Sequence, residues 1–188
     1  MKEENTDNPL LASEVIDFVT MAIAYYKSVT DDLIDQERFV FVDKMCKLLP
    51  ALYLKVNVLP KVEENDFVDL GQGVNEELYE DVRSKITTLL GEYDTYLDTF
   101  HEDMQYSDEP IARNISEDLS DVFQDLGDFL YNFREGTDEI RREALVQCKK
   151  SFSHYWGQRL LNALKALHSV RFNEQFVEEE LKNDSIPS

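Results

Sequence analysis

Long runs of apolar residues at helical spacing are the feature that most constrains this fold. Between Val15 and Val29, and again between Leu119 and Phe133, apolar side chains recur every three or four positions. This spacing places them on one side of an α-helix, which turns once in about 3.6 residues. The 188 residues include only six glycines and five prolines, so few positions interrupt these runs. We therefore expect long helices rather than many short strands.

Five long helices are predicted, and their ends follow from proline, glycine and capping residues. Pro50 interrupts the second helix, giving one kinked helix or two abutting ones, because proline lacks a backbone N–H and clashes with the preceding turn. Ser116 and Thr137 are candidate N-caps, and Gly136 is a candidate stop. The predicted helices lie at residues 10–33, 36–59, 76–100, 116–134 and 137–170.

The helices and their loops predict an all-α fold, an antiparallel bundle of five to seven helices. The apolar sector of the first helix also takes in Ile16, Val19 and Ile23 and is too wide for a surface helix, so we expect this helix to be central. The predicted organisation is a disordered N-terminus at 1–9, one bundle domain at 10–182 and a flexible tail at 183–188.

Three features of the sequence predict a cytoplasmic protein. Cys46 and Cys148 form no CxxC pair and lie in apolar runs, as expected for buried thiols in a reducing compartment. Residues 1–8 are acidic and polar, unlike the basic start of a secretory signal. The apolar run at 15–26 contains an aspartate and is too short to span a bilayer.

Negative charge is concentrated in one part of the chain. The formal net charge is −20, and residues 63–139 hold 23 acidic against 4 basic side chains. Two other segments have a positive balance: residues 38–62 hold five Lys/Arg against one Asp, and residues 140–171 hold seven Lys/Arg against one Glu. The overall balance argues against binding to nucleic acid or to anionic membranes, because both need Lys and Arg. It permits a basic protein partner or a cation, and it also keeps molecules apart in solution.

An acidic stripe, formed by Asp118, Asp121, Asp125 and Asp128, lies within an arc of about 80° on one predicted helix, opposite its Leu/Phe side. Like charges at this spacing repel one another. One interpretation is a docking face for a basic partner or a cation. The others are a solvated face, or internal pairing with the next helix through Arg141, Arg142, Lys149 and Lys150.

A metal site has weak support. Asp98 and His101 could share a metal, but di-metal bundles use such a pair from each of two helices, and only one is present. We therefore predict no metal and no cofactor. The segment around Trp156 and Gly157, with His154 before it and His168 beyond, is interpreted as a packed aromatic anchor or, alternatively, as a ligand contact.

No assembled catalytic motif appears: the chain has no nucleophile elbow, phosphate loop or dinucleotide fingerprint. The leading hypothesis is a non-enzymatic protein-interaction or regulatory module with an acidic docking surface, whose partner is another protein, basic if that surface is used. One alternative is an acidic nucleic-acid mimic or immunity-type inhibitor, which requires an exposed stripe. A second is a metal-binding helical-bundle enzyme. The oligomeric state is left open.

Three segments together resemble a bacterial family of small all-helical domains of unknown function. The resemblance covers about residues 10–170, and it implies a helical fold and a bacterial origin, with no activity, cofactor or catalytic residue attached. The segments are Leu48–Lys55 with Leu59-Pro60, Asp118–Leu126, and Tyr155-Trp156-Gly157 with Ala163-Leu164 and Leu167-His168.

Overall fold

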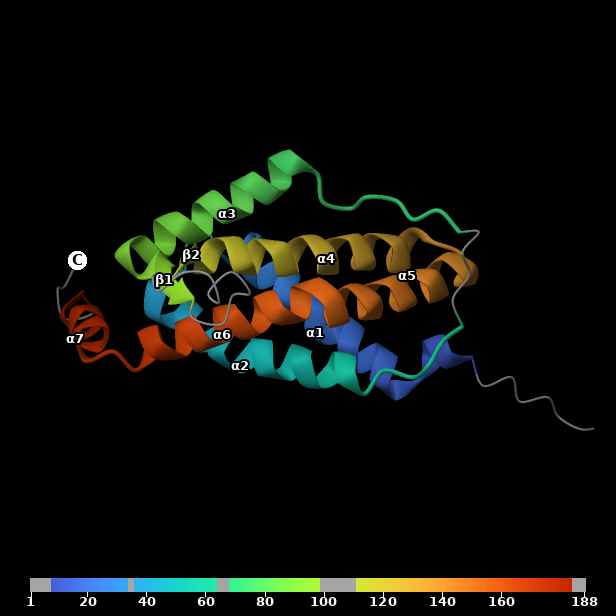
Figure 1. The fold of residues 1–188 in the computed structure, drawn as a ribbon, viewed down its shortest axis with the longest axis horizontal. Helices are drawn as coiled ribbons and strands as arrows, with labels where there is room; N and C mark the ends of the chain where they lie inside the picture. Colours follow the sequence, from blue (N-terminus) through green and yellow to red (C-terminus); the bar gives the residue numbers. More distant parts are fainter. Residues whose placement is uncertain (1–7, 34–35, 64–67, 99–110, 184–188) are drawn as a thin grey trace, which may run out of the picture.

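The computed structural model describes residues 8–33, 36–63, 68–98 and 111–183 (Figure 1). These residues confirm the all-α class, with one two-stranded hairpin in addition. The helices are α1 (Ser13–Val29), α2 (Arg38–Asn57), α3 (Glu76–Leu90), α4 (Ile115–Glu135), α5 (Asp138–Ser151), α6 (Gly157–Arg171) and α7 (Glu174–Asn183); the strands are β1 (Thr95–Asp98) and β2 (Ile111–Asn114). Short 3₁₀ turns occupy Pro9–Leu11, Asp31–Leu33 and Gly91–Asp94.

The centre of the bundle is α4, which packs against α1, α3, α5 and α6, whereas α2 packs against α1 and α6 (Figure 1). The prediction that the first helix is central is therefore wrong. One of its apolar faces is buried, but Ile16 and Ile23 on the other are exposed. A helix wheel counts apolar positions but cannot say how many neighbours the helix has.

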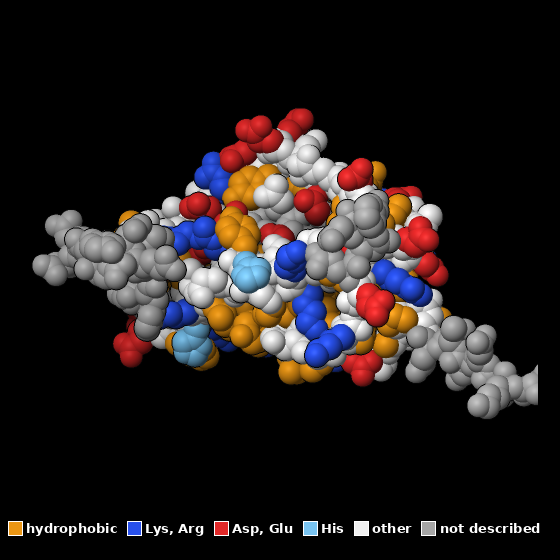
Figure 2. All heavy atoms as spheres, turned by 45° about the vertical axis from the view of Figure 1, so that its right-hand side comes forward, with side chains coloured by type: hydrophobic (Ala, Val, Ile, Leu, Met, Phe, Trp, Pro, Cys, Tyr) orange, Lys and Arg blue, Asp and Glu red, His pale blue; other side chains and the backbone are white. Residues whose placement is uncertain are grey.

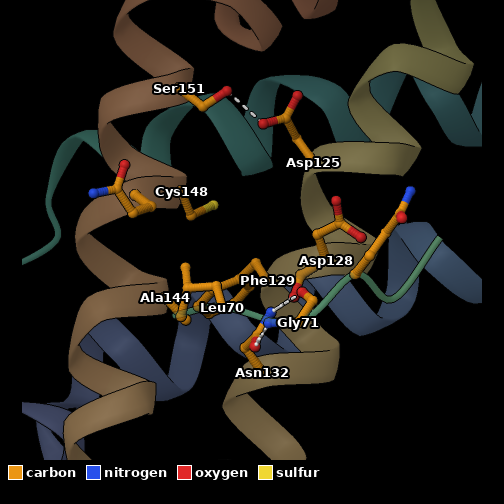
Figure 3. A pocket seen from close by; sticks show the side chains of 11 residues that line it. Leu70, Gly71, Asp125, Asp128, Phe129, Asn132, Ala144, Cys148 and Ser151 are labelled. Carbon is orange, nitrogen blue, oxygen red and sulfur yellow. Dashed lines mark hydrogen bonds between the residues drawn. The ribbon is translucent and has the colours of Figure 1, made fainter. Parts of the chain in front are cut away.

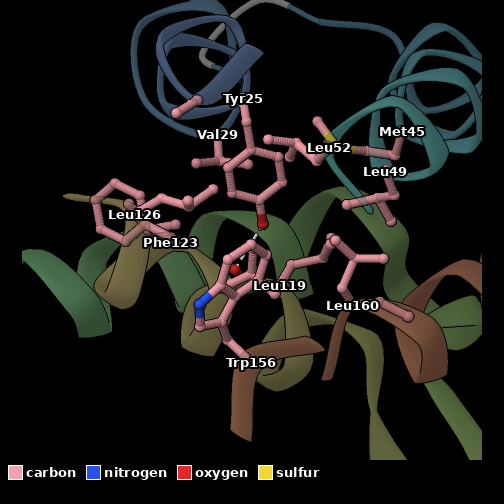
Figure 4. Close-up of a cluster of buried hydrophobic side chains, with 14 of the residues drawn as sticks. Tyr25, Val29, Met45, Leu49, Leu52, Leu119, Phe123, Leu126, Trp156 and Leu160 are labelled. Carbon is pink, nitrogen blue, oxygen red and sulfur yellow. Dashed lines mark hydrogen bonds between the residues drawn. The ribbon is translucent and has the colours of Figure 1, made fainter. Parts of the chain in front are cut away.

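The core is aromatic, and the buried phenol of Tyr25 and indole of Trp156 are hydrogen-bonded. The Tyr25 hydroxyl donates a 2.7 Å hydrogen bond to the carbonyl oxygen of Leu119, and Figure 4 shows the ring among Val29, Leu52 and other aliphatic side chains. Trp156 is fully buried, and its indole nitrogen donates to the carbonyl oxygen of Cys148 at 3.0 Å. These bonds remove the cost of burying a phenol and an indole.

α2 is one helix that runs unbroken through Pro50, so the break into two abutting helices is wrong. Proline removes the N–H of one residue only, and the Pro50 ring lies on the exposed side of the helix. Leu49 and Leu52 on either side are fully buried. Packing against α1 and α6 therefore holds the helix together across this position.

The third predicted helix is too long. It ends at Leu90, because Gly91 has a φ of 58°, a left-handed value that favours glycine. The chain then forms the antiparallel β1–β2 hairpin, in which Thr95 faces Asn114.

Three predicted helix ends follow the hairpin. The prediction that Ser116 is an N-cap is wrong, whereas the stop at Gly136 and the N-cap at Thr137 are confirmed. α4 begins one residue before Ser116, whose hydroxyl donates to Asp94 at 2.8 Å. Gly136 is the C-cap of α4, and the Thr137 side chain accepts from the amide of Ile140 at the start of α5.

The long last helix is confirmed as one continuous rod from Asp138 to Arg171, but it contains a π-helical turn at Phe152–Trp156 that joins α5 to α6. A Cβ at Gly157 would lie 2.4 Å from the carbonyl oxygen of Phe152, so only glycine fits after this turn. Such single π turns often mark functional positions. In the part of the chain that is described, no helix has both the length and the apolar character needed to cross a membrane.

Candidate functional site

The acidic stripe of α4 divides into two halves with different surroundings. Asp118 is fully buried and Asp121 retains only 6 % exposure. Asp125 and Asp128, two turns further on, are partly exposed. The docking-face and solvated-face interpretations are therefore wrong for the first half of the stripe, because α4 has neighbours on several sides and the side away from the Leu/Phe core faces α3 and α6.

The first half of the stripe is held by one guanidinium. Arg159 of α6 places Nη1 3.2 Å from Oδ1 of Asp118 and Nε 3.1 Å from Oδ2 of Asp121. Two tyrosine hydroxyls donate to the remaining oxygens: Tyr79 of α3 to Asp121 at 2.8 Å, and Tyr96 of β1 to Asp118. We call these five residues the Arg159 network; it ties α3, β1 and α6 to α4.

Burial controls the ionisation of this network. It raises the pKa of Asp118 to about 7, although the hydrogen bond from Tyr96 acts to lower that pKa. Burial and the hydrogen bond to Asp121 also raise the pKa of the Tyr79 phenol above its ordinary range. The tyrosines are thus donors at any physiological pH, whereas the Asp118 carboxyl group changes its protonation near pH 7.

Three of the predicted internal partners of the stripe, Arg141, Arg142 and Lys149, make other contacts. Arg141 donates through Nε to the carbonyl oxygen of Phe133 at 2.9 Å, and Lys149 donates to that of Leu59 at 2.8 Å. Internal pairing itself is confirmed, but through Arg159 and two tyrosines. Sequence spacing could not identify these partners, because they lie about 20 to 40 residues away from the stripe.

The second half of the stripe holds the segment that precedes α3. Oδ1 of Asp128 accepts the amides of Gly73 and Val74 at 2.7 and 2.9 Å. Asn132 accepts the amide of Gly71 at 2.8 Å and donates to its carbonyl oxygen at 2.7 Å. A Cβ at Gly73 would lie 2.7 Å from the backbone oxygen of Gly127, so the segment can approach α4 this closely only with glycine.

A cavity of about 350 Å³ opens between this segment, α4 and α5 (Figure 3). We call it the Asp125 pocket. Figure 3 shows Asp125 and Ser151 facing one another across its upper end, where the Ser151 hydroxyl donates to Oδ1 of Asp125. Apolar walls come from Leu70, Phe129 and Ala144, and polar groups from Asp125, Asp128, Gln147 and Ser151.

The described charged residues that line the Asp125 pocket are all acidic. Among the residues that the structure describes, no lysine or arginine lines it. Burial raises the pKa of Asp125 to about 6, and the carboxylates of Asp128 and Asp121 add to the rise while Ser151 opposes it. Burial also raises the pKa of the Cys148 thiol, which stays protonated and is therefore a poor nucleophile or metal ligand. The pocket thus offers an anionic carboxylate at neutral pH.

The other sequence candidates do not form a site in the described part of the chain. Asp98 is buried in β1 with the guanidinium of Arg113 at 3.7 Å, and His101 lies outside the described residues. No cluster of three or more potential metal-ligating side chains occurs within the described ranges. Trp156 is the predicted core anchor, while His154 and His168 are exposed, with the His168 ring 4.8 Å from that of Phe172.

Sequence reasoning missed Arg159, Ser151 and the role of the glycine segment. The one available signal was Gly71-Gln72-Gly73, whose two glycines permit close approach to a helix; we interpreted the segment as part of a loop.

Comparisons with known proteins agree with the fold and supply no activity. A family model described as "Domain of unknown function (DUF5063)" matches residues 10–173. The crystal structure of protein BF1032 from Bacteroides fragilis has 36 % sequence identity and a TM-score of 0.79, and the match covers 88 % of this chain and 96 % of that one. None of the curated proteins compared matches this sequence.

Proposed function

Because this chain belongs to the DUF5063 family, a bacterial all-helical domain family of unknown function, we propose its function from the site geometry: it is a non-enzymatic binding module that accepts a cationic group of a partner protein in the Asp125 pocket. The observation that carries the proposal is a partly buried carboxylate in an open pocket without a lysine or arginine among its described lining residues.

The electrostatics of Asp125 support a cationic ligand. Desolvation without a counter-charge raises the pKa of a carboxyl group, and an opposite charge nearby reverses this effect. An ammonium or guanidinium group in the pocket would therefore lower the pKa of Asp125 from about 6. A volume of about 350 Å³ is near the lower end of ligand pockets, roughly 300–1,000 Å³, and suits one side chain better than a large cofactor.

The hydrogen bonding around the pocket supports binding rather than catalysis. The amides of Gly71, Gly73 and Val74 already donate to Asn132 and Asp128, so they are not available to stabilise an oxyanion.

The alternative of an acidic nucleic-acid mimic receives less support from the same geometry. A mimic needs a row of exposed carboxylates, but Asp118 and Asp121 are buried against Arg159, and Asp128 is bonded to backbone amides. Asp125 alone does not reproduce the charge spacing of a phosphate backbone.

The test measures binding of three capped amino acids, N-acetyl-arginine, N-acetyl-lysine and N-acetyl-glutamine methylamides, by chemical-shift titration. We expect the two cationic probes to shift signals from residues around Asp125 and the neutral probe to do so far more weakly. Asp125→Asn, which keeps the shape of the side chain, should reduce binding of the cationic probes about tenfold or more.

Asp81→Asn on α3 is the matched control, because it removes an exposed carboxylate that pairs with Lys85 away from the pocket. It should leave probe binding unchanged. Equal binding by wild type and Asp125→Asn, or equal binding of the glutamine probe, would show that the pocket does not recognise a cation.

A further inference from the structure

A second cavity, of about 520 Å³, opens between α1 and the C-terminal half of α4. It is larger than the Asp125 pocket, and its volume lies within the usual range of ligand pockets, roughly 300–1,000 Å³. Apolar side chains of both helices line it: Val19, Ile23, Tyr26, Leu130 and Phe133. We call this cavity the Lys27 pocket, because Lys27 is one of the charged residues that line it.

Two glycines bring one wall of the Lys27 pocket close to α4. Gly73 and Gly127 both line the pocket, and a Cβ at Gly127 would lie 2.3 Å from Cγ2 of Val74. A Cβ at Gly73 would lie 2.5 Å from Cβ of Tyr131. The amides of Gly73 and Val74 donate to Asp128, so backbone contacts hold this wall in place before a ligand binds. A wall that is already formed reduces the entropic cost of binding.

The apolar walls are supported from behind by other rings. The Tyr26 ring lies 5.0 Å from the Phe123 ring, and the Phe133 ring lies 5.3 Å from the Phe129 ring, measured between centroids. Ile23 nevertheless remains 41 % exposed. An apolar ligand group in the pocket would remove this surface from water, which favours binding.

Lys27 and Asp31 bring opposite charges to the same pocket. α1 ends at Val29 and Asp31 begins the next 3₁₀ turn, so the two residues do not have the continuous helical spacing at which Lys and Asp pair. Both side chains are exposed, and within the described ranges neither has a hydrogen bond or an ion pair. The pocket therefore offers both an ammonium group and a carboxylate to a ligand.

Arg134, the other charged residue in the described lining, lies away from these two. α1 and α4 run antiparallel, so Lys27 near the end of α1 and Arg134 near the end of α4 lie toward opposite ends of the pocket. Arg134 also pairs with Glu135, through Nε at 2.6 Å. The ring contacts that establish the antiparallel order are Phe18 with Phe129 and Tyr26 with Phe123.

We infer that the Lys27 pocket binds a free α-amino acid with an apolar or aromatic side chain. Asp31 accepts the α-ammonium group, Lys27 donates to the α-carboxylate, and the side chain of the ligand lies against Ile23 and Leu130. Charge-assisted hydrogen bonds are stronger than neutral ones, and the apolar walls select the side chain. The Lys27 pocket is a different cavity from the Asp125 pocket, and the inference does not depend on the proposed function.

A zwitterion also suits the charge of the whole molecule. The formal net charge is −20, and Asp and Glu gather at the top of the face in Figure 2, where α3 lies. This field repels a simple anion and attracts cations in general. A ligand without net charge is neither repelled nor attracted as a whole, so its affinity depends on the local contacts with Lys27 and Asp31.

The test is a chemical-shift titration of the full chain with L-phenylalanine and with analogues that each lack one feature. N-acetyl-phenylalanine lacks the ammonium group, phenylalaninamide lacks the carboxylate, and alanine lacks the ring. We expect phenylalanine to shift the methyl signals of Val19, Ile23 and Leu130 in a saturable way, and each analogue to bind about tenfold more weakly.

Variants of the two charged residues assign the contacts. Lys27→Gln and Asp31→Asn should each weaken phenylalanine binding about threefold or more. Lys27→Gln should not weaken binding of phenylalaninamide, and Asp31→Asn should not weaken binding of N-acetyl-phenylalanine, because the contact in question is already missing from each analogue. Ile23→Trp, which places a larger ring in the pocket from an exposed position, should weaken phenylalanine binding as well.

Lys85→Gln and Asp81→Asn on α3 are the matched controls, since they remove exposed charges away from the pocket and should leave phenylalanine binding unchanged. Asp125→Asn should also leave it intact, which separates this inference from the proposed function. Circular dichroism verifies that each variant is folded. Equal binding of alanine, an equal loss in the α3 controls, or self-association in sedimentation velocity without binding of phenylalanine would overturn the inference.

Discussion

Replacing Arg159 with methionine should strongly destabilise the fold at pH 8. The guanidinium bridges Asp118 and Asp121, which are 0 % and 6 % exposed, so its loss removes the ion-pair partner of two buried carboxylates and leaves only the charge of Arg113 acting on Asp118. Removing one partner of a buried ion pair costs about 3–5 kcal/mol. Typical domains have a free energy of unfolding of only about 5–15 kcal/mol, so the change should be readily measured.

The assay is urea unfolding followed by far-ultraviolet circular dichroism at pH 8 and at pH 5. At pH 5 the destabilisation should be smaller, because the pKa of Asp118, already raised to about 7 in the wild type, rises further without the guanidinium and the carboxyl group is neutral. Arg83→Met is the control: its partner Glu80 is exposed, and such surface pairs contribute about 0–1 kcal/mol. A loss no larger than that of Arg83→Met, or the same loss at both pH values, would refute the reasoning.

Three further predictions follow from the same contacts. The folded pKa of Asp118 lies above its unfolded value of 3.8, so its contribution to stability is full below that value and is lost as pH rises through about 7; Asp118→Asn should flatten this part of the stability–pH curve measured by urea unfolding. Ser151→Ala removes a hydrogen bond that lowers the pKa of Asp125, so the pH midpoint for binding of the arginine probe should move upward, and an unchanged midpoint would contradict this role. Gly157→Ala should lower the thermal midpoint by several degrees, since its Cβ would meet the carbonyl oxygen of Phe152 at 2.4 Å, and an unchanged midpoint would mean that the π turn yields without cost.

A helical-wheel projection of α4 predicts the angular position of the four aspartates but not their burial. The wheel correctly placed Asp118, Asp121, Asp125 and Asp128 on one side of α4, away from the Leu/Phe core. It could not show that this side is covered by α3 and α6, because the wheel describes one helix in isolation. The cover provided by α3 and α6 determines what each aspartate of the stripe can bind. Asp118 forms an ion pair with Arg159 at one end of the stripe, whereas Asp125 faces an open pocket at the other end.

Where the helices differ from the prediction, the sequence carries only a weak local indication of the difference. Gly91 ends α3 through a single positive φ, and Pro50 fails to end α2 because packing on both sides of it outweighs one missing hydrogen bond. A glycine or proline changes the local preference by about 1–3 kcal/mol, which tertiary contacts can exceed.

By itself, the sequence determined the helical class, most helix positions and the separation of acidic from basic segments, because these depend on side-chain periodicity and composition along a local stretch of chain. Only the tertiary structure decided that α2 lies beside α6, that Arg159 reaches α4, and that the 68–75 segment forms one wall of a pocket. These contacts join residues far apart in the chain, and their energies depend on shape and on exclusion of water. Neither quantity has a signature in the spacing of residues along the chain.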